Sequence, residues 1–325
     1  MPEIKELFES FIDECQYSSN LSRETMRGYD ASFKLLIKIF PDLILEDITQ
    51  GKIVEFFKQL QTRERHVGRD TVKIGIKEST IATYRNKLSK FFTWLKRRGY
   101  LQDNPFTDLP APKVRYEDRQ FLGVEEIEKI LTAITINIDW QSELVKKRNL
   151  AMVYLFLYTG LRKGELLNLN VTDINFHDKT LHVRPETSKS RRSRILPINH
   201  KAMEALIDYI RERRRLGRQT PYLFVSSGRD DVLSYDGFKH LINQLNKASG
   251  VKFHAHQFRH TFAVNILKNG NNLVVIQEAL GHTDIRMTAK YLRQLPIEMT
   301  RRAVGSLNIS EFISSQGWGN ASHFS

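Results

Sequence analysis

The stretch 101–119 (LQDNPFTDLPAPKVRYEDR) constrains the fold most, because it interrupts a helical pattern that is present on both sides of it. It holds three of the nine prolines and no periodic apolar residues, which is typical of a linker. A chain of 325 residues is also long enough for two domains. We therefore predict a helical domain at 1–104, a linker at 105–119, a second domain at 120–307 and a tail at 308–325.

Four stripes of apolar residues at three- and four-residue steps precede the linker, and each predicts an amphipathic helix. The stripes are Ile4, Leu7, Phe11 and Cys15; Met26, Tyr29, Phe33, Leu36 and Phe40; Ile53, Phe56 and Leu60; and Ile81, Tyr84, Leu88, Phe91 and Leu95. We expect Ser22 and Ser79 to be the N-caps of the second and fourth helices. Segment 63–77 is interpreted as a polar, basic loop, so the first domain is a small helical bundle.

The chain after the linker is predicted to be mostly helical, with a short β insertion. Helices are expected at 125–136, 144–158, 202–215, 235–248, 257–269, 273–280 and 284–293. Thr283 is the expected cap of the last helix. Strands at 180–183 and 193–196 flank a basic turn at 186–192. The fold class is therefore mainly α, with an N-terminal helical bundle and a mixed, mostly helical second domain that contains a small β-sheet.

The charge of the chain indicates a polyanionic partner, although a merely basic protein would carry it too. Fifty Lys and Arg residues oppose 37 Asp and Glu residues, which gives +13 and a pI of about 9.7. Residues 1–112 carry 18 basic and 16 acidic side chains, so most of the excess follows the linker. The single Cys15 excludes an internal disulfide framework. Without a signal core or an apolar run near the roughly 20 residues of a membrane helix, we expect a cytoplasmic, nucleoid-associated protein with no membrane partner.

Two cationic candidates lie at expected ends of secondary structure. Arg162 follows the Thr-Gly break at 159–160, so it lies at a helix start, where free N–H groups and a guanidinium can bind an anion, and Glu165 shares its helix face. Lys189 lies in the basic turn, which can contact DNA phosphates. The neighbours expected to bind DNA with it are Arg191, Arg192 and Arg194. The plainer interpretations are an exposed Arg–Glu pair and a solvated run of charge.

Histidines and a tyrosine add to these candidates. His256 and Arg259 project to one helix face and can bracket a small anion. His282 lies in a turn after Gly281, and Tyr291 lies on the next helix. A buried histidine and a helix-packing tyrosine are the plainer alternatives. A zinc site has little support, because the chain has no paired cysteines and no H-E-x-x-H spacing for its histidines, which include His254, His256, His260 and His282.

Together these residues suggest a nucleophile among phosphate clamps. A free tyrosine has a pKa of about 10, so about one phenol in a thousand is ionised at neutral pH. Attack on a phosphodiester therefore needs a base for the proton and cations for the developing charge. Arginine suits the clamp because its planar group stays charged and binds two oxygens. No acidic cluster for magnesium accompanies the set, so we expect chemistry without a metal or another cofactor.

Four segments in order, TGLRKGEL, KSRRSRILPI, HQFRHTFA and LGHTDIRMTAKYL, resemble the tyrosine recombinase (phage integrase) family, which includes Xer-like site-specific recombinases. The resemblance covers nearly the whole chain. It implies a SAM-like core-binding domain before the linker and a catalytic domain after it, which clamp duplex DNA. It also implies DNA strand exchange through a 3′-phosphotyrosyl intermediate, without ATP.

The resemblance also implies a role for each motif residue. Tyr291 would be the nucleophile, and Arg162 and Arg259 would bind the scissile phosphate. Lys189 would protonate the departing 5′-hydroxyl. The remaining implied roles are acid/base for His256, a hydrogen bond to phosphate for His282 and support of the site for Glu165.

The implied partners are duplex DNA with specific recombination sites, a homo-tetramer on that DNA, and accessory proteins that bend it. The reaction would serve integration or excision of a mobile element, or the resolution of chromosome or plasmid dimers. The tail, with Phe312, Ile313 and Trp318, would dock on a neighbouring protomer or stay disordered. Two other functions remain open at this point: relaxation of DNA by a type IB topoisomerase and binding by a non-catalytic architectural protein.

Overall fold

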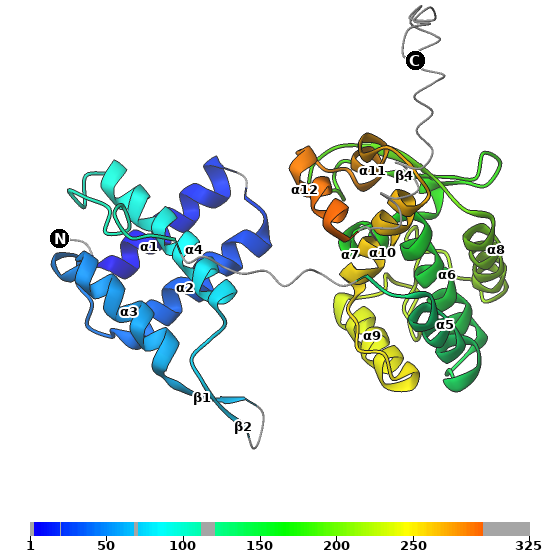
Figure 1. The fold of residues 1–325 in the computed structure, drawn as a ribbon, viewed down its shortest axis with the longest axis horizontal. Helices are drawn as coiled ribbons and strands as arrows, with labels where there is room; N and C mark the ends of the chain where they lie inside the picture. Colours follow the sequence, from blue (N-terminus) through cyan, green and yellow to red (C-terminus); the bar gives the residue numbers. More distant parts are fainter. Residues whose placement is uncertain (1–2, 20, 68–70, 112–120, 295–325) are drawn as a thin grey trace, which may run out of the picture. The chain divides into compact units, whose positions relative to one another are not determined.

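The computed structural model describes residues 3–19, 21–67, 71–111 and 121–294 (Figure 1). The chain divides into two compact units, Met1–Tyr116 and Glu117–Ser325, each with a hydrophobic core of its own. The predicted fold class is confirmed, because helices dominate both units and the strands form two small sheets. No helix within the described ranges is long and apolar enough to cross a membrane.

The four helices predicted for the first unit are present. They are α1 (Ile4–Asp13), α2 (Arg23–Ile39), α3 (Gln50–Thr62) and α4 (Glu78–Arg97), with short turns η1 (Glu14–Ser18) and η2 (Leu45–Asp47). Ser22 caps α2 as predicted, and its hydroxyl accepts from the Thr25 backbone N–H. The predicted cap Ser79 is wrong, because the extended residue Lys77 is the N-cap and its carbonyl receives the first bonds of α4, from Thr80 and Ile81.

Aromatic side chains fill the core of this unit. The rings of Phe8 and Phe33 stack with centroids 3.9 Å apart, and Phe91 meets Phe8 edge-on at 5.2 Å. From α3, Phe56 and Leu60 are fully buried. Burial of these large side chains is the main term that holds four amphipathic helices together.

The loop predicted at 63–77 is instead a β-hairpin. Strands β1 (Glu64–Val67) and β2 (Thr71–Ile74) pair antiparallel, with Glu64 opposite Ile74. The segment TVKI contains three β-branched residues, which favour a strand, and its charges obscured that signal. Figure 1 shows the hairpin extending beyond the helices of its unit.

The second unit contains the predicted helices and sheet. Its longer helices are α5 (Val124–Thr132), α6 (Glu143–Thr159), α8 (His200–Arg215), α9 (Tyr235–Ser249), α10 (Ala255–Lys268) and α11 (Leu273–Leu280). Its short helices are η3 (Ala133–Asn137), α7 (Lys163–Leu167), η4 (Val171–Asp173), α12 (Ile285–Ala289) and η5 (Lys290–Gln294). Strands β3 (Ile174–Asn175), β4 (Thr180–Val183) and β5 (Arg194–Pro197) form one antiparallel sheet in the order β3-β4-β5.

Helix α6 is the centre of this unit and packs against α8 and α10. Apolar residues surround it on all sides, which is why residues such as Met152 and Leu155 are fully buried. It ends at Gly160, whose φ of 61° is left-handed. A Cβ there would lie 2.3 Å from the ring of Phe262, so only glycine fits this turn.

The end of the described chain differs from the prediction. The expected helix at 284–293 is divided into α12 and the 3₁₀-helix η5. Its cap is Asp284 and not Thr283, because the Asp284 carboxylate accepts from the Arg286 backbone N–H. The predicted tail at 308–325 lies outside the described residues.

Candidate active site

The turn after α6 positions Arg162 and Glu165. Arg162 is the N-cap of α7, as predicted, and its backbone N–H donates to Glu165 Oε2 at 2.9 Å. Its Nη1 donates to Glu165 Oε1 at 2.9 Å. The Glu165 side chain is 1% exposed and that of Arg162 is 20% exposed, so this is not the exposed helix pair considered as the plainer alternative.

Arg194 on β5 binds the same carboxylate. Its Nη2 and Nη1 donate to Glu165 Oε2 and Oε1 at 2.7 and 3.1 Å. Burial raises the pKa of Glu165, but the Arg194 hydrogen bond, the Arg194 charge and then Arg162 outweigh it, so the pKa lies below its ordinary value. The Arg194 side chain is 8% exposed, and all three of its guanidinium nitrogens donate inside the protein, to Glu165 and to the Ala279 carbonyl, which differs from the expected DNA contact.

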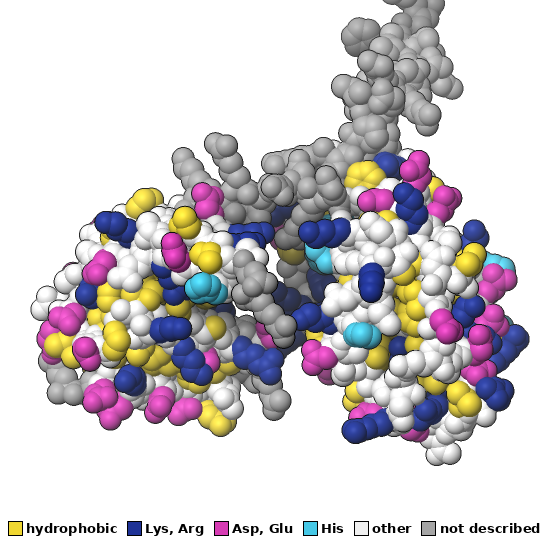
Figure 2. All heavy atoms as spheres, turned by 90° about the horizontal axis from the view of Figure 1, so that it is seen from below, with side chains coloured by type: hydrophobic (Ala, Val, Ile, Leu, Met, Phe, Trp, Pro, Cys, Tyr) yellow, Lys and Arg dark blue, Asp and Glu magenta, His cyan; other side chains and the backbone are white. Residues whose placement is uncertain are grey.

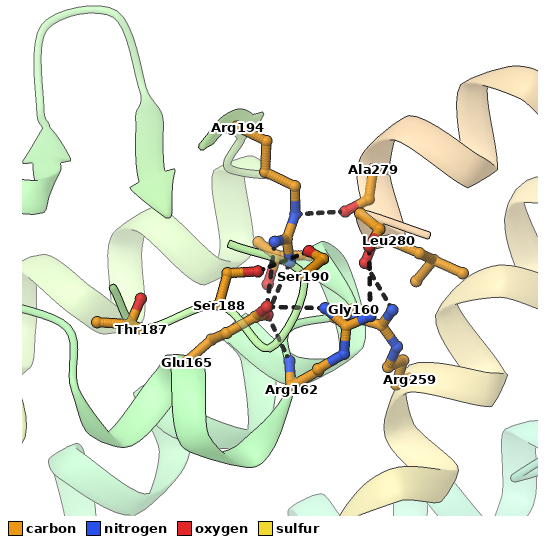
Figure 3. Close-up of polar contacts among 12 residues, drawn as sticks. Gly160, Arg162, Glu165, Thr187, Ser188, Ser190, Arg194, Arg259, Ala279 and Leu280 are labelled. Atoms are coloured by element: carbon orange, nitrogen blue, oxygen red, sulfur yellow. Dashed lines mark hydrogen bonds and ion pairs between the residues drawn. The ribbon is translucent and has the colours of Figure 1, made fainter. Parts of the chain in front are cut away.

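The C-terminal end of α11 joins three arginines. Arg194 Nε donates to the Ala279 carbonyl at 2.9 Å, and Arg259 Nη2 donates to the Leu280 carbonyl at 2.6 Å (Figure 3). Arg162 Nη2 donates to the Gly281 carbonyl at 3.3 Å. Carbonyls at a helix C-terminus lack partners within the helix and carry partial negative charge, so they bind cations well. Three successive carbonyls thus each receive a different guanidinium.

Arg259 is the most buried of these arginines. It is 1% exposed, and its Nη1 donates to the Gly160 carbonyl at the end of α6 at 2.7 Å. Burial, and then the charge of Arg162, lower the pKa of Arg259 to about 9. Arg162 and Arg194 bind the carboxylate of Glu165, whereas Arg259 binds two carbonyls, so the three guanidiniums share one carboxylate charge and the cluster has an excess of positive charge (Figure 3). An anion that enters the cluster is therefore stabilised.

His282 lies in the predicted turn, between α11 and α12. It is buried, and its Nδ1 shares a hydrogen bond of 2.8 Å with Thr288 Oγ1. Burial, followed by the charges of Arg259 and Arg162, lowers the pKa of His282 to about 3. The ring is therefore neutral at physiological pH and has one N–H to donate.

Tyr291 lies on η5 and is buried, and its hydroxyl shares a hydrogen bond of 3.0 Å with His260 Nδ1. Its ring packs in a small cluster with Phe262 and Leu280. His260 directly follows Arg259 on α10, so this hydrogen bond joins the phenol to the helix that carries that arginine.

Sequence reasoning missed His260 as the partner of Tyr291. His256 is exposed, and its ring meets the His260 ring edge-on with centroids 4.5 Å apart. The available signal was the i, i+4 spacing of the two histidines on α10, which places them on one helix face. Sequence reasoning considered His260 only as a zinc ligand. Within the described ranges no group of three or more His, Cys, Asp or Glu side chains could hold a metal ion.

The basic turn between β4 and β5 contributes Ser188 and Ser190, which Figure 3 draws beside Glu165 and Arg194, and Ser188 is buried. Lys189 is exposed, and no hydrogen bond or ion pair of the described residues joins it to Arg162 or Arg259. Arg191 and Arg192 are exposed, and Arg191 has a left-handed φ of 51°. The structure thus joins Arg162, Glu165, Arg194 and Arg259 through bonds at one carboxylate and two helix ends. His282 directly follows Gly281 at one of these ends, Tyr291 is bonded to His260, and the side chain of Lys189 stays exposed.

Comparison with known families covers both units. A model described as "Phage integrase family" matches residues 120–296, and one described as "Phage integrase, N-terminal SAM-like domain" matches residues 8–99. A tyrosine recombinase of Thermosipho africanus is 29% identical over 88% of this chain and 94% of its own length. Tyrosine recombinase XerC of Alcanivorax borkumensis is 32% identical over 67% of this chain and 69% of its own length.

Solved structures share the fold. The Tn1549 transposon integrase in complex with transposon right end DNA has a TM-score of 0.71 at 19% identity, over 94% of this chain and 99% of the other. The XerH site-specific recombinase bound to palindromic difH substrate has a TM-score of 0.69 at 19% identity, over 91% of this chain and 83% of the other.

Proposed function

The chain belongs to the phage integrase family of tyrosine recombinases, and from this premise we propose that Tyr291 cuts and rejoins duplex DNA at specific sites. The Tyr291 oxygen attacks the scissile phosphorus and forms the 3′-phosphotyrosyl bond, while the 5′-oxygen departs. Attack by the free 5′-hydroxyl of a partner strand then restores a phosphodiester and releases the phenol. The bond energy is conserved in the intermediate, so no nucleotide cofactor is required.

One observation carries the proposal: three arginines cluster around a single carboxylate and two helix ends, and a tyrosine hydroxyl is bonded to the neighbour of one of them (Figure 3). That hydroxyl belongs to Tyr291, and its partner His260 directly follows Arg259 on α10. A phosphodiester brings one negative charge and two non-bridging oxygens. A guanidinium has five N–H donors, of which the bonds described above use two on Arg162 and two on Arg259, so both arginines keep donors for those oxygens. Neutral His282 supplies one more hydrogen bond. Donors that are already in place when charge develops lower the barrier, with each worth about 3 kcal/mol.

For proton transfer we propose two groups. His256 is the acid/base for the phenol, and His260 holds that phenol through the bond of 3.0 Å. Lys189 protonates the departing 5′-hydroxyl. Its exposed position on the turn between β4 and β5 suits a group that reaches the site only when DNA lies against the turn.

Arg194 has a different role from its neighbours in that turn. We propose that it positions Glu165, and through Glu165 the catalytic Arg162, while Arg191 and Arg192 contact DNA. Two guanidiniums on one buried carboxylate fix the geometry of the cluster. Loss of Arg194 leaves Glu165 with Arg162 alone.

The relatives suggest the partners. The solved structures of XerH and of the Tn1549 integrase are complexes with DNA, and we propose duplex DNA with specific sites as the substrate here. A homo-tetramer on that DNA, assisted by proteins that bend it, is the proposed assembly. Integration or excision of a mobile element and resolution of dimers are both uses of this reaction.

Suicide substrates from the DNA that flanks the gene test this function. The substrate has a nick close to the scissile phosphate, on the side of the departing 5′-oxygen. Cleavage then releases a short fragment that carries the free 5′-hydroxyl and diffuses away. Because that fragment cannot rejoin, the protein stays covalently attached to the DNA. We expect attachment by the native chain that survives denaturant, and none by Tyr291→Phe, which lacks only the hydroxyl. DNA affinity should stay within about twofold, because the phenol is buried. Covalent attachment by Tyr291→Phe would remove Tyr291 from the role.

A further inference from the structure

The β1–β2 hairpin is an exposed ribbon without a third strand. The side chains of β2 are all exposed, and Ile74 is 74% exposed. A two-stranded hairpin contributes little stability by itself in water, because it buries little apolar surface. The hairpin is therefore poorly explained as a device for stabilising the fold.

The hairpin also carries the net charge of its domain. Segment 63–77 holds five basic and two acidic residues, whereas the whole of 1–112 holds 18 basic and 16 acidic. Without this segment, the first 112 residues would have a slight excess of acid. Figure 2 shows side chains of both signs on the visible face of this unit, on the left. Positive charge is concentrated locally in the segment that contains the ribbon.

Two of these cations are directly opposed. Arg65 pairs with Lys73 across the strands, so their side chains lie on the same face. Neither forms an ion pair with any described residue, although other cations of the unit do. Those ion pairs are Arg27–Glu24, Lys34–Asp30, Lys52–Glu55, Lys96–Asp103, Arg97–Glu14 and Arg98–Glu14. Like charges opposite one another destabilise a hairpin unless an anion neutralises them.

The base of the ribbon is firmly attached to α3. The Gly75 N–H donates to the Arg63 carbonyl at 2.8 Å, and the Ile76 N–H donates to the Leu60 carbonyl at 3.1 Å. Arg65 Nε donates to the Gly75 carbonyl at 2.7 Å, which fixes the guanidinium over the strands. Gly75 has a φ of 63°, and a Cβ there would lie 2.2 Å from the Gln61 carbonyl oxygen. The basic face is thus held in one orientation.

From this arrangement we infer that the β1–β2 ribbon binds the DNA backbone, with Arg65 and Lys73 as its phosphate contacts. The inference rests on the proposed function, which supplies duplex DNA as the polyanion. Phosphate contacts set the position of a protein on DNA without reading its sequence. The ribbon therefore adds affinity and orientation to the first domain, separately from the chemistry in the second.

Salt-dependent binding of the full chain to a duplex of arbitrary sequence tests the inference. Each phosphate contact contributes about 0.9 to the slope of log affinity against log salt. The double variant Arg65→Gln with Lys73→Gln should make that slope shallower by about 1.8. Its affinity near 0.1 M salt should be reduced roughly 10- to 100-fold. The matched control is Lys34→Gln with Lys96→Gln, which removes two charges from the same unit that are already ion-paired. The control should change the slope far less.

Each outcome separates the inference from the proposed function. If the native chain attaches covalently to the suicide substrate and the Arg65/Lys73 variant binds with an unchanged slope, the ribbon inference alone is wrong. If the native chain neither binds duplex DNA nor attaches to it, the proposed function is wrong. The opposite face of the ribbon is probed by Val72→Thr with Ile74→Thr, which keeps the charge and the strand propensity. A loss of DNA binding confined to this variant would make the ribbon an apolar contact and overturn the inference.

Discussion

At the scale of single residues, the geometry of the site depends on the buried carboxylate of Glu165. Glu165 is almost fully buried, and it accepts hydrogen bonds from the backbone and side chain of Arg162 and from Arg194. A buried carboxylate is costly unless cations and donors compensate it, and here two arginines do. The arginines in turn depend on Glu165 for their orientation. If the proposed roles of the arginines are correct, Glu165 couples the geometry of the site to the stability of the fold.

Arg194→Gln should destabilise the chain by about 3 kcal/mol, since it leaves part of a buried ion pair uncompensated. It should also move the acid limb of the cleavage rate to higher pH. In the native chain the pKa of Glu165 is lowered, so its contribution is present above its unfolded pKa and is lost as pH falls through the folded pKa. Without Arg194 the folded pKa rises, and protonation occurs at higher pH.

Single-turnover cleavage of the suicide substrate at a series of pH values measures this effect. Arg194→Lys should restore part of the native profile, because it retains the charge. Glu165→Gln serves as the control, because it removes the carboxylate that titrates. Its cleavage rate should therefore lack the fall at low pH that protonation of Glu165 causes. A cleavage profile of Arg194→Gln identical to the native one, together with weakened DNA binding, would return Arg194 to a role in DNA contact.

His282 predicts a second pH effect, on stability. Its folded pKa of about 3 lies below its ordinary 6.5, so the unfolded chain binds the proton more tightly. The free energy of unfolding should therefore fall as pH drops from 6.5 toward 3. His282→Gln should flatten the upper part of this window, as measured by urea unfolding at a series of pH values. An equal pH slope in both proteins would contradict the burial of a neutral ring.

At the scale of elements, two helix ends build the site. The end of α6 provides the Gly160 carbonyl, and the end of α11 provides three consecutive carbonyls. The sequence predicted both helices and both terminal glycines, because periodicity and C-terminal glycines are local signals. It did not predict which side chains these carbonyls bind. The charged residues of segment 63–77 likewise obscured the strand pattern of the β1–β2 hairpin, which only the structure shows.

Gly160→Ala tests the first of these helix ends. The substitution strains a left-handed residue and forces its Cβ into the ring of Phe262. We therefore expect the free energy of unfolding to fall by at least about 3 kcal/mol. Cleavage should also be slower, because the turn that carries Arg162 is displaced. Gly250→Ala is the matched control, because Gly250 has a φ of 70° at the end of α9 with open space around it. The free energy of unfolding of that variant should fall by about 1 kcal/mol, and its cleavage rate should be unchanged. Equal losses in thermal unfolding would show that strain alone governs both sites.

At the scale of the whole molecule, the net positive charge is distributed unevenly between the two units. Residues 1–112 are nearly neutral apart from segment 63–77, whereas the rest of the chain carries most of the excess of 13 positive charges. The second unit combines that charge with the buried arginine cluster. DNA binding by this molecule should therefore depend strongly on salt, while covalent chemistry depends on the second unit.

A plasmid assay separates recombination from simple relaxation at this scale. Strand exchange needs specific sites, so a supercoiled plasmid that lacks them should remain supercoiled on incubation with the chain. A plasmid with two sites should yield recombinants, which gel electrophoresis resolves. Relaxation of the plasmid without sites would instead support the type IB topoisomerase alternative.

The sequence by itself determined the helices, the small β insertion and the ordered motifs that carry the candidate residues, because each is encoded within a few neighbouring positions. Only the tertiary structure decided that Arg194 faces Glu165, that Tyr291 pairs with His260, and that one helix end receives three arginines. Those contacts join residues 29, 31 and up to 119 positions apart. Periodicity records which face of a helix is buried, but packing alone selects the partner that the face meets.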